Sequence, residues 1–200
     1  MDSIDNRLKD IAEIRSLMEQ SSKFLSLSGL SGVSAGAVGI AACAIAWMQL
    51  GKSGSDHADT QMLLLYSLEA VVTLACAIGL AAYFSTRMAK RNGLEVWTAA
   101  TKYLVMNLFV PLAAGGAFCG ILAYHGIYWL IAAAMLIFYG LALLNASKYT
   151  LREIRYLGIS EIGLGLMGAM WPDYGLILWG AGFGMLHVLY GAFMYMKYEK

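Results

Sequence analysis

Charged residues are scarce in this chain of 200 residues. Lysine, arginine, aspartate and glutamate make up only 14% of the sequence, and the net charge is +1. A soluble domain usually carries about 25% charged residues. A charge balance so close to neutral also offers no basic surface for phosphate backbones. The composition therefore excludes an ordinary soluble domain and predicts no nucleic-acid partner.

Proline, cysteine and catalytic motifs are also scarce or missing. The chain has two prolines, and its three cysteines, Cys43, Cys76 and Cys119, lie in apolar stretches without a CxxC pair or a histidine at ligand spacing. This pattern argues against a disulfide framework or a metal site. The sequence contains no HExxH, GxSxG, HxxxH, phosphate-binding loop or aspartate-rich prenyl-diphosphate motif. We therefore expect a non-enzymatic protein without catalytic residues, cofactor or metal.

Apolar residues are abundant: 60% of the chain is hydrophobic and the mean hydropathy is +0.63. They fall into six segments, at about 24–48, 62–85, 101–124, 127–147, 156–171 and 174–196. Crossing the bilayer takes about 20 residues of helix, a length that only the fifth segment fails to reach. The segments lack the alternation of a strand, so they predict an all-α polytopic membrane protein with six transmembrane helices.

The positions of lysine and arginine predict the orientation of these helices. Thirteen cations fall before the first segment, between the second and third, between the fourth and fifth, or at the C-terminus, and only Lys52 falls on the opposite side. Short cytoplasmic loops carry the excess of positive charge. We therefore expect a multi-pass protein of the cell (inner) membrane with both termini in the cytoplasm.

Residues 1–22 predict an amphipathic helix ahead of a six-helix transmembrane domain at 23–200. Ile4, Leu8, Ile11 and Met18 share one face, and charged residues lie opposite. Such a helix lies on the membrane or covers the bundle. The alternative is a contact for a protein partner or for a homo-oligomer.

The transmembrane domain reads as three helical hairpins, at about 23–87, 102–148 and 155–197. Each opens with a cation that is followed thirteen residues later by a glycine: Lys23 and Gly36, Lys102 and Gly115, Arg155 and Gly168. Small residues let membrane helices approach closely. We expect packing roles for Gly32, Gly36, Gly115, Gly116, Gly120, Gly168, Gly180 and Gly184.

Ionisable residues inside a membrane are costly and are candidates for function. Glu69, His187 and Glu161 are the three in this chain, and their positions predict an order from outer through middle to inner depth. That order suits a proton or cation path, although each residue could instead serve only the packing of the bundle. Asn107 stands before Pro111, and we expect it to fill the hydrogen-bonding gap that the proline opens.

The C-terminal hairpin, Gly163 to Lys197, carries spaced glycines, Pro172 at its tip, and then Gly182, Gly184 and Gly191. This pattern resembles the hairpin repeat of the HdeD-type acid-resistance membrane proteins, which also have six spans in three hairpins. The resemblance implies a membrane stress role with no known catalytic residues. Two functions remain open: a non-enzymatic membrane protein of stress response, assembly or signalling, and a small-solute or ion transporter or channel.

Overall fold

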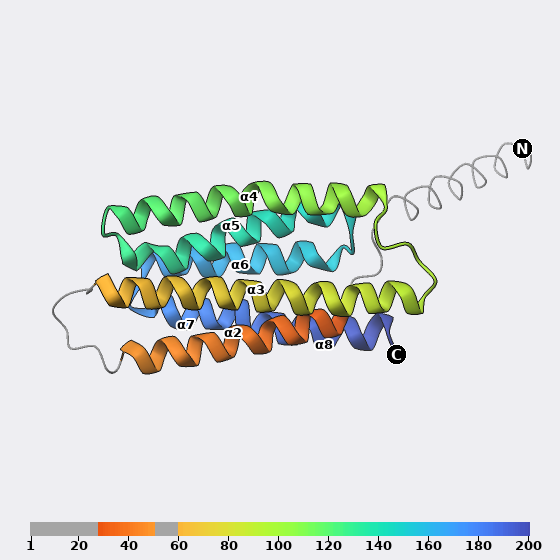
Figure 1. Ribbon diagram of the computed structural model, residues 1–200, viewed down its shortest axis with the longest axis horizontal. Helices are drawn as coiled ribbons and strands as arrows, with labels where there is room; N and C mark the ends of the chain where they lie inside the picture. Colours follow the sequence, from red (N-terminus) through yellow and green to blue (C-terminus); the bar gives the residue numbers. More distant parts are fainter. Residues whose placement is uncertain (1–27, 51–59) are drawn as a thin grey trace, which may run out of the picture.

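The computed structural model describes residues 28–50 and 60–200, which form a bundle of antiparallel helices with no strand in that part of the chain (Figure 1). The long helices are α2 (Gly29–Leu50), α3 (Thr60–Arg91), α4 (Ala99–Tyr124), α5 (Ile131–Ala146) and α6 (Glu153–Met170). The last part of the bundle is α7 (Gly175–Trp179), a π-helical turn η4 (Gly180–Leu186) and α8 (His187–Tyr198), which follow one another without a break. The predicted all-α fold is confirmed. The amphipathic helix predicted at 1–22 lies outside the described residues.

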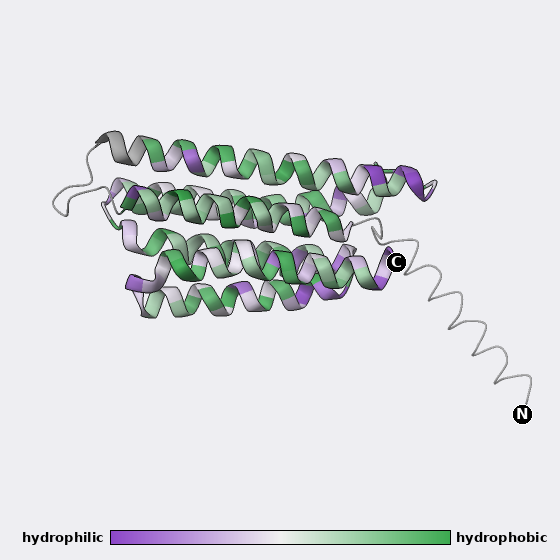
Figure 2. Cartoon of the chain, turned by 90° about the horizontal axis from the view of Figure 1, so that it is seen from below, coloured by the Kyte–Doolittle hydropathy of each residue, from purple (hydrophilic) through white to green (hydrophobic). Residues whose placement is uncertain are grey.

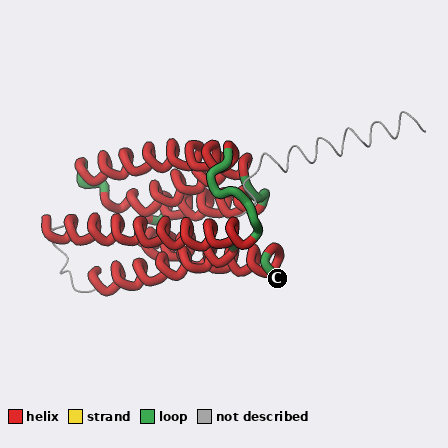
Figure 3. Tube along the Cα trace, turned by 45° about the vertical axis from the view of Figure 1, so that its right-hand side comes forward, coloured by secondary structure: helices red, strands yellow, loops and turns green. Residues whose placement is uncertain are grey.

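The connections after α4 are short, whereas a longer loop joins α3 to α4 (Figure 3). Three 3-10 turns, η1 (Tyr128–Leu130), η2 (Ser147–Tyr149) and η3 (Pro172–Tyr174), adjoin the helices of the second and third hairpins. Gly93 and Gly126 have positive φ angles of 66° and 74° and end the turns after α3 and α4. Glycine is suited to both places because a Cβ disfavours that conformation.

Five helical segments of the described chain are long and apolar enough to cross a membrane, and α6 is the helix left out. It has 18 residues, among them Glu153, Arg155 and Glu161. The sequence also predicts the fifth span to be the shortest. The helix α3 is longer than predicted because it continues to Arg91, beyond the apolar segment.

The helices pack in a defined order. The most extensive contact joins α5 and α6, and α2 packs against both α3 and the η4–α8 segment. The helices α3 and α4 have few neighbours: α3 mainly contacts α2, and α4, at the upper edge of Figure 1, mainly contacts α5. Their outward side chains are apolar, including Leu68, Val71, Met106 and Phe109. This is the expected surface of helices that face lipid, and it leaves the centre of the bundle to α2, α5, α6 and η4–α8.

Glycines bring α2 and α8 into backbone contact. A Cβ at Gly32 would lie 2.9 Å from the Cα of Gly191, and one at Gly36 would lie 2.7 Å from the carbonyl oxygen of Gly184. These distances leave no room for a side chain. The α2–α8 interface therefore depends on glycine.

The other predicted packing glycines fall into two groups. Buried or tightly packed positions within the bundle are occupied by Gly115, Gly168, Gly180 and Gly184. The prediction is wrong for Gly116 and Gly120, where an added Cβ would meet nothing within 4 Å. The two lie on the side of α4 that faces away from α5, since Gly115 is the glycine that touches Phe138.

The end of the bundle where α2 begins and α8 ends is the polar one (Figure 2). Every lysine and arginine of the described residues lies there: Arg87, Lys90, Arg91, Lys102, Lys148, Arg152, Arg155, Lys197 and Lys200.

Two carboxylates at this end connect the C-terminus to the start of other helices. Glu199 accepts hydrogen bonds from the Ser28 hydroxyl, at 3.0 Å, and from the Gly29 backbone N–H, at the start of α2. Glu153, which precedes the predicted fifth span, accepts from Lys197 and from the Tyr198 hydroxyl. Although partial burial acts to raise it, these hydrogen bonds lower the pKa of the Glu153 carboxyl below its ordinary value.

Candidate functional site

Three polar side chains from three helices meet in the interior of the bundle. His187 Nε2 lies 2.8 Å from the hydroxyl oxygen of Tyr139 on α5, and His187 Nδ1 lies 2.9 Å from the carbonyl oxygen of Gly182. The same Nδ1 is 3.4 Å from Glu161 Oε1 on α6. Glu161 is 0% exposed and His187 is 6% exposed. We call Glu161, His187 and Tyr139 the central polar cluster.

The π-helical turn η4 positions the histidine. Its extra residue per turn brings the Gly182 carbonyl, five residues earlier in the chain, within reach of the His187 ring. Single π-helical turns are rare and occur often at functional sites. Aromatic rings brace the same turn, because Phe183 packs against Tyr139 with ring centroids 4.9 Å apart and against Trp179 at 5.0 Å. The local geometry of the site thus depends on an irregular helix.

Gly182 also provides the space for the Glu161 carboxyl group. A Cβ on Gly182 would collide with Glu161 Oε2 and with the Leu136 side chain. The carboxyl therefore packs directly against the backbone of η4. Both of its oxygens are buried without a hydrogen-bond partner in the described part of the chain.

The basic side chains at the starts of the predicted hairpins are not placed beside Glu161 in the described residues. Arg155 and Lys102 are exposed at the polar end of the bundle, and Lys23 lies outside the described residues. The residue beside Glu161 is His187. Arg155 faces away because six residues of α-helix correspond to about one and two-thirds turns.

Glu69 does not join the central polar cluster. It faces α2, where its carboxyl lies close to Gln49 and interacts electrostatically with Cys43. Its two oxygens and the Gln49 Oε1 are buried, and no hydrogen bond of good geometry satisfies them. The prediction that Glu69, His187 and Glu161 lie at three successive depths is therefore wrong. Glu161 and His187 touch each other, while Glu69 belongs to the α2–α3 contact.

Asn107 has a different role from the one expected. Pro111 removes the hydrogen bond to the backbone carbonyl of Asn107, and the amide of Asn145 on α5 donates to that carbonyl at 3.4 Å. The side chain of Asn107 donates instead to the Tyr103 carbonyl at 2.8 Å. The gap in α4 is thus filled from the neighbouring helix.

Sequence reasoning missed Tyr139 and Asn145. Tyr139 lies near the middle of the predicted span 127–147, whereas tyrosines of membrane helices usually lie at the interfaces. A tyrosine in the middle of a predicted span therefore indicates that its hydroxyl has a polar partner inside the bundle. Asn145 lies near the C-terminal end of the same predicted span, and its partner is visible only once α4 and α5 are placed.

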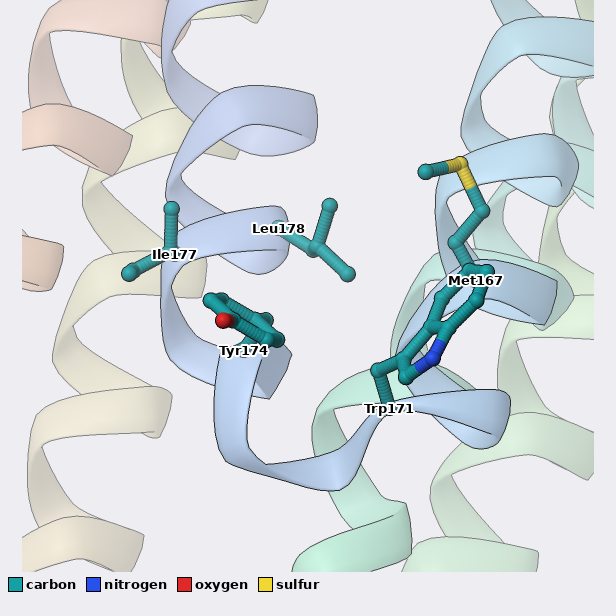
Figure 4. A pocket seen from close by; sticks show the side chains of 5 residues that line it. All are labelled: Met167, Trp171, Tyr174, Ile177 and Leu178. Atoms are coloured by element: carbon teal, nitrogen blue, oxygen red, sulfur yellow. The ribbon is translucent and has the colours of Figure 1, made fainter.

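A surface groove lies at the other end of the bundle (Figure 4). Its volume is about 290 Å³, and it is lined by Met167, Trp171, Tyr174, Ile177 and Leu178, where α6 and α7 meet. The lining side chains are apolar or aromatic, and the central polar cluster is not among them. Apart from the Tyr174 phenol, the lining has no ionisable group, so the groove offers no carboxyl or imidazole for acid–base chemistry.

The central polar cluster is suited to holding a proton. It combines a carboxylic acid, an imidazole and a phenol, all of which exchange protons. Nowhere in residues 28–50 and 60–200 do three His, Cys, Asp or Glu side chains come together as metal ligands do. Comparison with protein-family models, curated proteins and solved structures finds no match to this chain.

Proposed function

We propose that this chain is a non-enzymatic membrane protein of stress response, assembly or signalling, which crosses the inner membrane six times with both termini in the cytoplasm. The gathering of every described lysine and arginine at one end of the bundle supports this orientation. The helix α6 would complete the six as the fifth span in chain order, since it runs antiparallel between α5 and the α7–α8 segment (Figure 1).

The observation that carries a non-transport role is the close packing around Glu161. Its carboxyl rests against the Gly182 backbone beside the Leu136 side chain, and the residue has no exposed surface. Transporter sites near the midplane typically use interrupted helices that line a cavity for the solute. Here the irregular turn η4 packs against its neighbours instead, which favours a structural or responsive core over a conduit.

The second candidate is a proton-coupled transporter. One observation favours it: two ionisable side chains, Glu161 and His187, lie 3.4 Å apart inside the bundle. Intramembrane carboxyl and imidazole groups form proton relays in pumps and transporters. In that case the central polar cluster would open to each side of the membrane in turn.

The contact for a partner would be the amphipathic helix at 1–22, which carries its apolar residues on one face. The three hairpins would descend from one repeated unit. The burial of Gly36, Gly115 and Gly168, one in each hairpin, supports this reading. The resemblance to HdeD-type proteins also favours a stress role.

A flux measurement separates the two candidates. The purified chain is reconstituted in proteoliposomes that contain a pH-sensitive dye, and a pH gradient is imposed. We expect the rate of proton entry to equal that of liposomes without protein, and Glu161→Gln to leave it unchanged. A rate that rises with the amount of protein and is abolished by Glu161→Gln would overturn the non-transport role.

Capture of partners tests the role of the N-terminal helix. The chain is purified in mild detergent, and co-purifying proteins are identified by mass spectrometry. A specific partner should be lost from Leu8→Asp, which breaks the apolar face, and kept by Asp5→Asn on the opposite face. Equal recovery of the partner with both variants would exclude the helix as the contact.

A further inference from the structure

The hydrogen bonds of His187 fix the position of its proton. A backbone carbonyl oxygen only accepts hydrogen bonds, so Nδ1, which lies 2.9 Å from the Gly182 oxygen, must carry a hydrogen. In a neutral imidazole the other nitrogen is then an acceptor. It is satisfied by the hydroxyl of Tyr139 at 2.8 Å. These two hydrogen bonds thus fully satisfy a neutral His187 ring.

The carboxyl group of Glu161, in contrast, lacks hydrogen-bond partners among the described residues. Both carboxyl oxygens are buried without a hydrogen bond in this part of the chain, and His187 Nδ1, 3.4 Å from Oε1, is closer to the Gly182 oxygen. An ionised carboxylate in this setting would lack the donors and the opposite charge that stabilise it. A protonated carboxyl group is neutral and avoids that cost.

We propose that the central polar cluster is a proton-binding site, in which Glu161 holds the proton and Tyr139 is a positioning residue that fixes the tautomer of His187. The groups that face it are Tyr139 from α5, Glu161 from α6 and His187 from α8, while α2 approaches this part of α8 through Gly32 and Gly36, which carry no titratable group. This inference stands whether the protein signals or transports.

Release of the proton changes one hydrogen bond in the π-helical turn. The O–H bond of Glu161 breaks and the proton leaves to water, so a carboxylate remains. The His187 Nδ1–H, at 3.4 Å, turns from the Gly182 carbonyl to this carboxylate, because a charged acceptor is the stronger one. His187 remains neutral throughout. The Gly182 carbonyl in η4 then loses its side-chain donor, so the proton on Glu161 controls the bracing of the turn.

Infrared spectroscopy of the full chain in lipid nanodiscs tests the site. A protonated carboxylic acid gives a C=O band that is separate from the carboxylate and amide bands. Because the Glu69 carboxyl is also buried without a hydrogen bond, the band is assigned in the Glu69→Gln background. We expect Glu69→Gln at neutral pH to show the band and the double variant Glu69→Gln/Glu161→Gln to lack it. Absence of the band from Glu69→Gln, or its persistence in the double variant, would overturn the proposal.

Isotope labelling provides the same reading without a substitution of Glu161. Carboxyl-labelled glutamate should shift the band in Glu69→Gln, where Glu161 is the remaining candidate intramembrane glutamate, and this result is needed if the Glu161→Gln variants do not fold. A wild type that shows only carboxylate bands at neutral pH refutes the site. The proposed non-transport role is tested separately, by the proton-flux measurement in proteoliposomes.

The role of Tyr139 is tested by magnetic resonance of isotope-labelled histidine, with His187→Gln used to assign the His187 signal. We expect the Nδ1–H tautomer in the wild type. In Tyr139→Phe the ring loses the donor to Nε2, and we expect a population with the hydrogen on Nε2. If Tyr139→Phe leaves the tautomer unchanged, Tyr139 is not a positioning residue.

Discussion

Replacement of Gly36 by alanine is expected to push α2 away from α8 and to destabilise the bundle. The new Cβ would lie 2.7 Å from the Gly184 carbonyl oxygen and 2.7 Å from the Val188 backbone nitrogen. Ordinary contact begins at 3.4 Å, so the two helices would have to separate by about 0.7 Å. These two obstacles are backbone atoms, which cannot rotate away, and the Cγ2 atom of the stiff, β-branched Val188 side chain is a third obstacle at 2.7 Å.

The expected magnitude is the difference of two terms. Overpacking of a tight interface costs about 1–3 kcal/mol, and alanine recovers up to about 1 kcal/mol through its higher helix propensity. We therefore expect a net loss of about 1–2 kcal/mol in the free energy of unfolding. The measurement is equilibrium unfolding in mixed micelles with a denaturing detergent, followed by circular dichroism.

Gly116→Ala is the matched control. It makes the same chemical change in a helix, but an added Cβ there meets nothing within 4 Å. We expect its stability to equal the wild type or to exceed it by up to about 1 kcal/mol. If Gly36→Ala proves as stable as Gly116→Ala, the backbone contact between α2 and α8 does not hold the bundle together.

Three further outcomes are expected. Asn145→Ala leaves a backbone carbonyl of α4 without its donor and should lower the free energy of unfolding by about 0.6–1 kcal/mol; an unchanged value would mean that water or lipid satisfies that carbonyl. Glu153 has a lowered pKa because of its hydrogen bonds, so the stabilisation from its Lys197 contact should be present at neutral pH and lost as pH falls through the folded-state pKa; unfolding midpoints should show this loss in the wild type but not in Glu153→Gln. Impermeant thiol reagents should label Ser55→Cys but not Asn92→Cys in intact cells, and the reverse result would invert the topology.

The positions of the helices could be predicted from the sequence because they depend on local properties. The thickness of the bilayer sets the length of each apolar segment, and each predicted segment overlaps a helix of the structure, including the short one that became α6. The gathering of lysine and arginine at one end of the bundle could likewise be predicted, because it depends only on where these residues fall between the apolar segments. Gly32 and Gly36 were found because small residues four apart mark a close helix contact.

The tertiary structure decided which residues meet. Gly116 and Gly120 have the same spacing as Gly32 and Gly36, yet they face outward, because spacing shows that residues share a face and not what that face contacts. The partner of Glu161 depends on the rotation of α6 against α8 and on the extra residue in η4, neither of which is visible in hydropathy. The site thus arises from long-range packing, since the sequence identifies Glu161 and His187 as costly residues and only the packed bundle brings them together with Tyr139.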